Sequence, residues 1–156
     1  MDVKLVVKNE TALHKFAATL ADVCRTYLGT IIFLQGELGA GKTTFARGFL
    51  HELGHQGHVK SPTYTYVESY EIDDVIVHHF DLYRVKDPHE LEQMGLRDYF
   101  TETSLCLIEW PEYGRPYLPV ADLICHIDFA STGRVVHLLA ASPRGKEILE
   151  RCGYGI

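Results

Sequence analysis

The segment formed by residues 31–44 constrains the fold of this chain more than any other. It begins with the apolar run IIFL, half of it β-branched, which predicts a strand buried on both faces. The octapeptide GELGAGKT then starts at Gly36. This octapeptide is a complete GxxxxGK[ST] phosphate-binding loop, and a helix is expected after it. The segment therefore predicts an α/β fold built around a nucleotide site.

The chemistry of this loop depends on backbone N–H groups that wrap a polyphosphate. Its glycines allow turns that point successive amides inward, and the start of the next helix adds a positive electrostatic potential. Lys42 is expected to reach the β and γ phosphates, and the Thr43 hydroxyl to bind Mg²⁺. The residues of this loop that are predicted to bind nucleotide are Glu37, Leu38, Gly39, Ala40, Gly41, Lys42, Thr43 and Thr44.

The composition predicts one domain that spans residues 1–156. With 46% hydrophobic and 23% charged residues, the chain is typical of globular proteins. No apolar run resembles a signal or membrane segment, so we expect a cytoplasmic protein without a membrane partner. The net charge of −6 argues against broad contact with nucleic acid phosphates by this chain alone. The cysteines form no CxxC pair, and free thiols are expected.

Two further apolar runs end in acidic residues. A predicted strand over residues 75–84 carries Asp81 near its end, and a second, buried strand ends at Glu109. At the carboxyl edge of a parallel sheet, such acids bind Mg²⁺ or orient the attacking water of a phosphate-loop enzyme. The predicted catalytic residues are Lys42, Asp81 and Glu109, and the predicted metal ligands are Thr43, Asp81 and Glu109. Which acid has which role stays open, and a surface aspartate that begins a turn is the alternative for Asp81.

Hydroxyl side chains precede the first of these strands. The segment SPT places Ser61 and Thr63 in a switch-like loop, which can carry a hydroxyl toward the magnesium and the γ phosphate. A Ser-Pro turn that only caps the next strand is the alternative. His51, His55 and His58 gather just before this segment, but no acid or cysteine joins them. A surface linker is therefore favoured over a metal site.

The remaining pattern completes a mixed sheet. A short edge strand is predicted over residues 3–7, and apolar spacing predicts a helix over residues 13–27. Residues 64–84 predict an antiparallel hairpin, and residues 87–95 a short capped helix. Two strands and a terminal helix follow. The predicted fold class is α/β, a single P-loop NTPase-like domain of three layers, in which a parallel core with added antiparallel strands is flanked by helices.

Four motifs resemble, in order and approximate spacing, the TsaE (YjeE) family of bacterial ATPases: GELGAGKTT, SPTYTYVESY, HFDLYR and LIEWPE. The resemblance implies a small ATPase that works with the TsaB and TsaD proteins to make the threonylcarbamoyl modification on adenosine next to the anticodon of tRNA. It also implies that the chain does not transfer the group itself and meets tRNA only indirectly, through the complex. ATP and Mg²⁺ are the implied cofactors.

The resemblance also assigns roles to residues. The family's phosphate and magnesium residues fall on Gly39, Gly41, Lys42, Thr43 and Thr44, its switch-like segment on Ser61 and Thr63, and its catalytic edge on Asp81, Glu109 and Trp110. Adenine recognition is expected near residues 10–11 and the C-terminal loops, with Thr11 as a predicted contact. Trp110 is a further predicted nucleotide contact, for which a packing role is the alternative.

The expected activity is a Mg²⁺-dependent ATPase that is slow alone. No NKxD segment for guanine is present, and no arginine finger is visible, so a partner would complete the site. Two alternatives remain. A small-molecule kinase would need an arginine-bearing lid, and the arginines are dispersed along the chain. A nucleotide-gated binding module would use ATP to set the affinity for a partner, without functional turnover.

Overall fold

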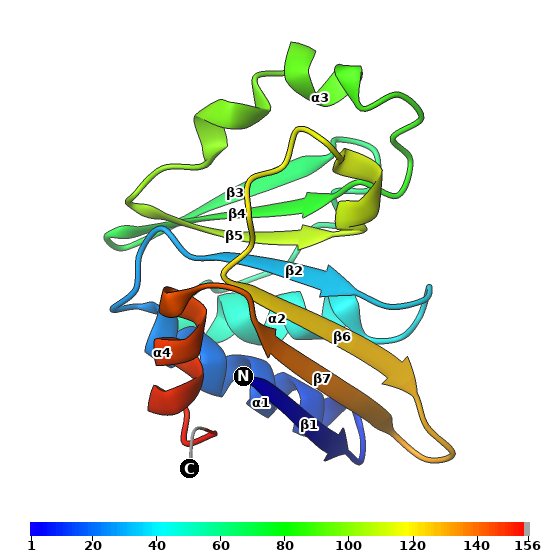
Figure 1. Ribbon diagram of the computed structural model, residues 1–156, viewed down its shortest axis with the longest axis vertical. Coiled ribbons are helices and arrows are strands. Elements are labelled where there is room, and N and C mark those ends of the chain that lie inside the picture. The colour runs from blue at the N-terminus through cyan, green and yellow to red at the C-terminus, as the bar shows by residue number, and fades with distance from the viewer. Residues whose placement is uncertain (155–156) are drawn as a thin grey trace.

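The structure is a computed structural model that describes residues 1–154, so residues 155–156 of the predicted domain lie outside the described residues. Figure 1 labels its elements. In chain order they are β1 (Asp2–Val7), α1 (Glu10–Cys24), β2 (Ile31–Gln35), α2 (Lys42–Leu53), β3 (Val67–Ile72), β4 (Val75–Asp81), α3 (His89–Gln93), the 3₁₀ helix η1 (Leu96–Tyr99), β5 (Ser104–Glu109), the 3₁₀ helix η2 (Pro111–Gly114), β6 (Leu123–Phe129), β7 (Arg134–Ala140) and α4 (Pro143–Arg151).

The strands form one seven-stranded sheet in the order β1-β7-β6-β2-β5-β4-β3. The central strands β6, β2, β5 and β4 run parallel, while β7 and β1 on one side and β3 on the other add antiparallel pairs. This arrangement confirms the predicted mixed sheet. Strand β2 lies in the middle, with neighbours that come from different parts of the chain. Its carboxyl end is therefore a topological switch point, where open α/β sheets bind ligands.

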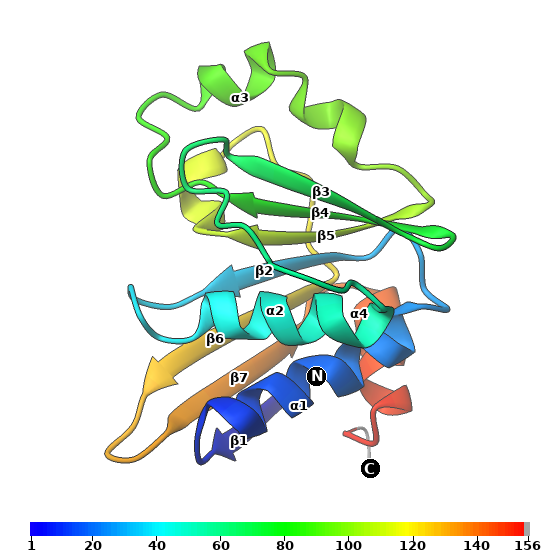
Figure 2. The same ribbon diagram turned by 180° about the vertical axis from the view of Figure 1, so that it is seen from behind.

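Helices cover both faces of the sheet. Helices α1 and α2 lie side by side across one face, and their buried Leu13 and Phe45 pack in the same core cluster as Leu34 of β2 (Figures 1 and 2). On the opposite face, α3 and η1 cover the half around β4 and β5, where Leu91 packs in a second cluster with Ile31. Strand β2 thus contributes to both clusters, as its apolar run predicts. The predicted α/β fold class is confirmed.

The hairpin of β3 and β4 is shorter at both ends than the predicted 64–84 segment. Strand β3 begins at Val67, because Tyr66 has a left-handed backbone with φ 68° and donates its N–H to the Pro62 carbonyl at 2.7 Å, which closes a turn. Strand β4 ends at Asp81, whose carboxylate accepts the N–H of Tyr83 at 3.0 Å and turns the chain. Both corrections come from turn contacts that a two-residue alternation does not reveal.

The other elements agree with the sequence except at some boundaries. Helix α1 ends at Cys24 rather than at residue 27, because a tighter turn follows in which the Tyr27 amide donates to the Cys24 carbonyl at 3.0 Å. Cys24, Cys106 and Cys125 are buried free thiols, as expected. Burial raises the pKa of Cys125 to about 12, which keeps this thiol protonated near neutral pH. Within residues 1–154, no helix has the length and apolar character needed to cross a bilayer.

Candidate functional site

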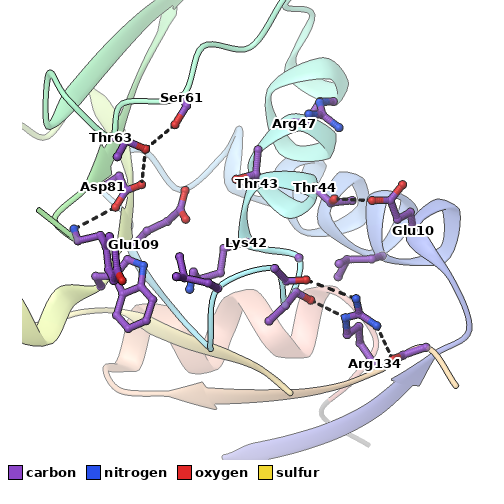
Figure 3. A pocket seen from close by; sticks show the side chains of 18 of the residues that line it. Glu10, Lys42, Thr43, Thr44, Arg47, Ser61, Thr63, Asp81, Glu109 and Arg134 are labelled. Carbon is purple, nitrogen blue, oxygen red and sulfur yellow. Dashed lines mark hydrogen bonds between the residues drawn. The ribbon is translucent and has the colours of Figure 1, made fainter. Parts of the chain in front are cut away.

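A cavity of about 640 Å³ lies at the carboxyl ends of β2, β5 and β4, beside the start of α2 (Figure 3). Segments that are far apart in the sequence meet around it. Its lining consists of Asn9, Glu10, Leu13, Leu38, Gly39, Ala40, Gly41, Lys42, Thr43, Thr44, Arg47, Ser61, Thr63, Asp81, Tyr83, Arg84, Glu109, Trp110, Gly133 and Arg134. The phosphate loop, the switch-like hydroxyls and both predicted acids therefore share one cavity.

The phosphate loop (residues 36–43) has a backbone that requires glycine at two points. Gly36 has φ 146°, and a Cβ there would lie 2.5 Å from the backbone oxygen of Ile127. Gly41 has φ 123°, and its Cβ would lie 2.5 Å from a methyl group of Leu13. Gly41 is also the N-cap of α2, and no side chain caps this helix. The first amides of α2 therefore remain available to an anion in the cavity.

Lys42 is held inside the cavity by the loop and by Trp110. Its ammonium group donates to the carbonyls of Gly36 and Glu37, the latter at 3.3 Å, and lies 4.0 Å from the centroid of the Trp110 ring. Burial lowers the pKa of Lys42, and the negative charge of Glu109, with a smaller effect from Asp81, opposes that shift. The lysine is thus a desolvated cation that faces acidic side chains, so its charge acts strongly on groups inside the cavity.

Asp81 and Glu109 are neighbours across two parallel strands. They are the last residues of β4 and β5, and the register pairs them directly. The same row continues to Leu34 on β2, just before the phosphate loop, which is aligned with Glu109. The three strand ends therefore bring both acids to the loop. The sequence indicates that each acid ends a strand, but only the register shows that they are adjacent.

A hydrogen-bond network connects Asp81 to the switch-like loop. The Thr63 hydroxyl donates to Oδ2 of Asp81 at 3.2 Å, and the Ser61 hydroxyl oxygen lies 2.6 Å from that of Thr63 (Figure 3). Burial and then the charge of Glu109 raise the pKa of Asp81, against the hydrogen bonds from Tyr83 and Thr63. The alternative of a simple surface aspartate is therefore wrong, because Asp81 is buried and repelled by a second carboxylate.

Trp110 both lines the cavity and packs against aromatic neighbours. Its backbone is left-handed, with φ 56° and ψ 51°, directly before η2. This turn places the indole ring over Lys42, at 4.9 Å from the Tyr83 ring and stacked on Tyr113 at 5.7 Å between centroids. The two roles considered for this residue are thus compatible in one side chain.

The structure brings three arginines to the site, of which only Arg84 belongs to one of the four family motifs, HFDLYR. Arg47, Arg84 and Arg134 all line the cavity. Arg134 donates from Nε to the Ala40 carbonyl at 2.8 Å and so supports the phosphate loop (Figure 3), while Arg84 donates to the Tyr64 hydroxyl at 3.2 Å. The arginines are dispersed along the chain but gather in space. No local pattern marks Arg47 and Arg134 as site residues, because the segments that carry them meet only in the fold.

Two predicted nucleotide contacts do not line the cavity. Thr11 is exposed in the first turn of α1, whereas its neighbours Asn9 and Glu10 line the cavity. Glu10 also accepts a hydrogen bond from the Thr44 hydroxyl at 3.3 Å. Glu37 lines a separate, smaller hollow beside β6 and β7, although its carbonyl contacts Lys42. Successive residues of a helix point about 100° apart, so in α1 the side chain of Thr11 points away from the cavity that Glu10 lines.

The three histidines after the phosphate loop do not form a metal site. Within the part of the chain that the structure describes, no group of three or more His, Cys, Asp or Glu side chains could hold a metal ion. Instead, the His55 ring lies 3.1 Å from the His58 carbonyl through Nε2 and stacks on the His51 ring. These histidines lie at the end of α2 and in the segment that follows it.

Comparison with known proteins identifies the family. The family model described as "Threonylcarbamoyl adenosine biosynthesis protein TsaE" matches residues 7–136, which include all four motifs and Arg134. The chain belongs to the TsaE family. The "tRNA threonylcarbamoyladenosine biosynthesis protein TsaE" of Haemophilus influenzae is 47% identical over 146 residues, which cover 92% of each chain. The Bacillus subtilis protein of that name is 42% identical over 91 residues, 58% of this chain and 56% of its own.

A solved structure supports the same assignment. The crystal structure of Bacillus subtilis YdiB matches with a TM-score of 0.83 and 28% sequence identity, covering 98% of this chain and 95% of that one. The likeness extends over the whole sheet and its helices. The resemblance found in the four motifs is therefore confirmed at the level of family and of fold.

Proposed function

We propose that this chain is the ATP-binding and ATP-hydrolysing component of the machinery that makes threonylcarbamoyladenosine in tRNA. Membership of the TsaE family supports the part in this tRNA modification. The observation that carries the ATPase activity is the in-register pair of Asp81 and Glu109, which faces a complete phosphate loop across one cavity. In this proposal the chain acts on a complex of TsaB and TsaD in the cytoplasm and does not transfer the threonylcarbamoyl group.

The residues around the cavity fit ATP and Mg²⁺. Three oxygen donors line it close to the loop, namely the Thr43 hydroxyl and the carboxylates of Asp81 and Glu109. Mg²⁺ prefers hard oxygen ligands of this kind and is often bound through one or two carboxylates. The glycine backbone and the uncapped start of α2 suit phosphate. Bound Mg²⁺ would neutralise charge on the phosphates.

The chain's own residues have separable tasks in this proposal. The amides of residues 39–44 bind and orient the phosphates, and Lys42 adds a desolvated positive charge that stabilises charge developing on the transferred group. Asp81 and Glu109 hold the metal or orient the attacking water. Trp110 covers Lys42 and limits the access of solvent to the reacting phosphate.

Partners complete the proposed activity. Arg134 is engaged with the Ala40 carbonyl and Arg84 with Tyr64. Arg47 is exposed on α2 and makes no side-chain hydrogen bond within the described residues, so no contact places any of the three as a finger. Slow hydrolysis by the chain alone is expected, because a missing arginine finger can be worth about 10³-fold or more in rate. The net charge of −6 supports contact with tRNA only through the TsaB and TsaD partners.

The deciding experiment measures phosphate release from ATP with Mg²⁺ and no small-molecule acceptor, by the chain alone and then with TsaB and TsaD. A low rate that rises in the complex is the expected result. The Glu109→Gln variant serves as the control for contaminating ATPases. A rate at background in both cases, together with tight ATP binding, would overturn the ATPase proposal and favour a nucleotide-gated module. Phosphate release that requires an added acceptor would favour a kinase.

A further inference from the structure

His79 is a buried polar residue that the proposed mechanism leaves without a task. It lies on β4 and is 1% exposed, on the same side of the strand as Asp81. Its Nε2 atom lies 2.6 Å from Oε2 of Glu109, at the end of the neighbouring strand β5. Both side chains are almost fully removed from solvent. A polar contact of this length between buried groups restricts how either can turn.

The partners of the imidazole ring indicate where its proton lies. A carboxylate only accepts hydrogen bonds, so the hydrogen belongs on Nε2 of His79. Nδ1 of His79 is the buried side-chain atom that lacks a hydrogen-bond partner in the described part of the chain. A neutral ring with its proton on Nε2 leaves only a lone pair unpaired there. The other tautomer would bury an unpaired N–H and place two acceptors against each other.

This hydrogen bond distinguishes the two oxygens of Glu109. Oε2 is engaged with His79, whereas Oε1 accepts no hydrogen bond from the described residues. Among the described residues, Nδ1 of His79 is the only fully buried side-chain nitrogen or oxygen that lacks a hydrogen-bond partner. Oε1 of Glu109, which also lacks a partner, is therefore not fully buried. Oε1 is therefore the oxygen that Glu109 presents to the cavity it lines. The contrast with Asp81 is informative, because Thr63 and Tyr83 both hold that carboxylate.

We propose that His79 is a positioning residue, which holds the Glu109 carboxylate so that Oε1 faces the phosphate end of the cavity. The inference rests on the proposed function, in which Glu109 binds Mg²⁺ or orients water. His79 itself lines no part of the cavity and acts only through Glu109. Removing a hydrogen bond that orients a metal ligand costs about 10- to 100-fold in metal affinity or activity.

Two amide substitutions at position 79 form a matched test. In His79→Gln, the side-chain amide nitrogen can take the place of Nε2 and still donate to Glu109. In His79→Asn, the amide lies near the place of Nδ1 and is too short to reach. We expect His79→Asn to lower the rate of ATP hydrolysis with TsaB and TsaD by about 10- to 100-fold. His79→Gln should recover most of that loss.

A binding measurement separates positioning from a merely structural role. Trp110 is the only tryptophan of the chain and lines the cavity, so its fluorescence reports nucleotide binding. In the absence of Mg²⁺, His79→Asn should bind ATP as tightly as the unaltered chain. If Glu109 binds the metal, the variant should need an about 10-fold higher Mg²⁺ concentration for hydrolysis. If Glu109 orients water, only the rate of hydrolysis should fall. A lower melting temperature with unchanged Mg²⁺ dependence and rate would overturn the proposal.

Two further measurements keep the inference testable if His79→Asn does not fold. Nitrogen NMR of the unaltered chain should show a proton on Nε2 of His79, and an unprotonated Nε2 would overturn the proposal, because that atom could then not donate to Glu109. In a Glu109→Ala background, His79→Gln should leave the affinity for ATP with Mg²⁺, measured by Trp110 fluorescence, unchanged, whereas an additional loss of affinity would show that His79 acts apart from Glu109. If the unaltered chain bound ATP but never hydrolysed it, the proposed function would fail, while these two measurements would still decide on His79.

Discussion

The phosphate loop and the acid edge, formed by Asp81 and Glu109, line the same cavity but are built in opposite ways. The loop is one continuous segment whose binding groups are mainly backbone amides, and an added Cβ would meet the Ile127 backbone at Gly36 and a methyl group of Leu13 at Gly41. The acid edge is made of side chains from two strands, each held by a residue from elsewhere in the sequence. The loop is therefore sensitive to added atoms, and the acid edge to removed hydrogen bonds.

The largest effect is expected where the two regions meet. Lys42→Met removes the cation that the loop carries and that faces both acids, so ATP hydrolysis should fall by on the order of 10³-fold. Phosphate release measures the rate, and Trp110 fluorescence measures the remaining affinity for ATP. Lys146→Met, an exposed lysine on α4, is the control and should behave as the unaltered chain. A hydrolysis rate within about tenfold of that of the unaltered chain would contradict a catalytic role for Lys42.

The acid edge should lose rate while it keeps affinity. Glu109→Gln retains an acceptor for His79 but removes the charge, and we expect hydrolysis to fall by about 10²-fold with ATP binding retained. Asp81→Asn is the matched variant on the neighbouring strand. Titration of Mg²⁺ with both variants assigns the roles, because the acid that binds the metal is the one whose loss raises the Mg²⁺ requirement. Equal affinity losses in both would contradict the division between loop and edge.

The loop should show the reverse behaviour. Gly41→Ala forces a side chain into a left-handed backbone and against Leu13, and a cost of about 1–2 kcal/mol corresponds to roughly tenfold weaker ATP binding. Gly57→Ala is a matched control, because Gly57 has φ 103° with nothing within 4 Å of its Cβ position. The control should lower the melting temperature but leave ATP affinity unchanged. Unaltered binding by Gly41→Ala would show that the loop can relax.

The smallest effect concerns stability and pH. The pKa of Asp81 is raised in the folded chain by burial and by Glu109, so its ionised form opposes folding. Below the pKa that Asp81 has in the unfolded chain, its carboxyl is protonated in both states and does not change the free energy of unfolding. The free energy of unfolding decreases as the pH rises through the higher pKa of Asp81 in the folded chain. Asp81→Asn should raise the melting temperature of the nucleotide-free chain by about 2 °C at pH 7 and leave it unchanged near pH 3. A lower melting temperature at pH 7 would mean that the Thr63 and Tyr83 hydrogen bonds outweigh the repulsion.

Local patterns in the sequence account for much of this protein. The loop motif, the apolar runs and the acids at their ends depend on neighbours along the chain, so the mixed α/β sheet and the acids Asp81 and Glu109 could be predicted. The four motifs were also sufficient to indicate the TsaE family. The predicted element boundaries were wrong where a single turn mattered, as at Tyr66, whose left-handed backbone delays the start of β3.

Tertiary structure decided what these local patterns leave open. The pairing of Asp81 with Glu109 is a matter of strand register, and the approach of Arg134 to the phosphate loop and of His79 to Glu109 depends on how distant segments pack. Periodicity reports which face of an element is buried, but it carries no information on which distant side chain lies opposite. The sequence by itself therefore determined the chemistry available to this protein, and only the fold determined which groups act together.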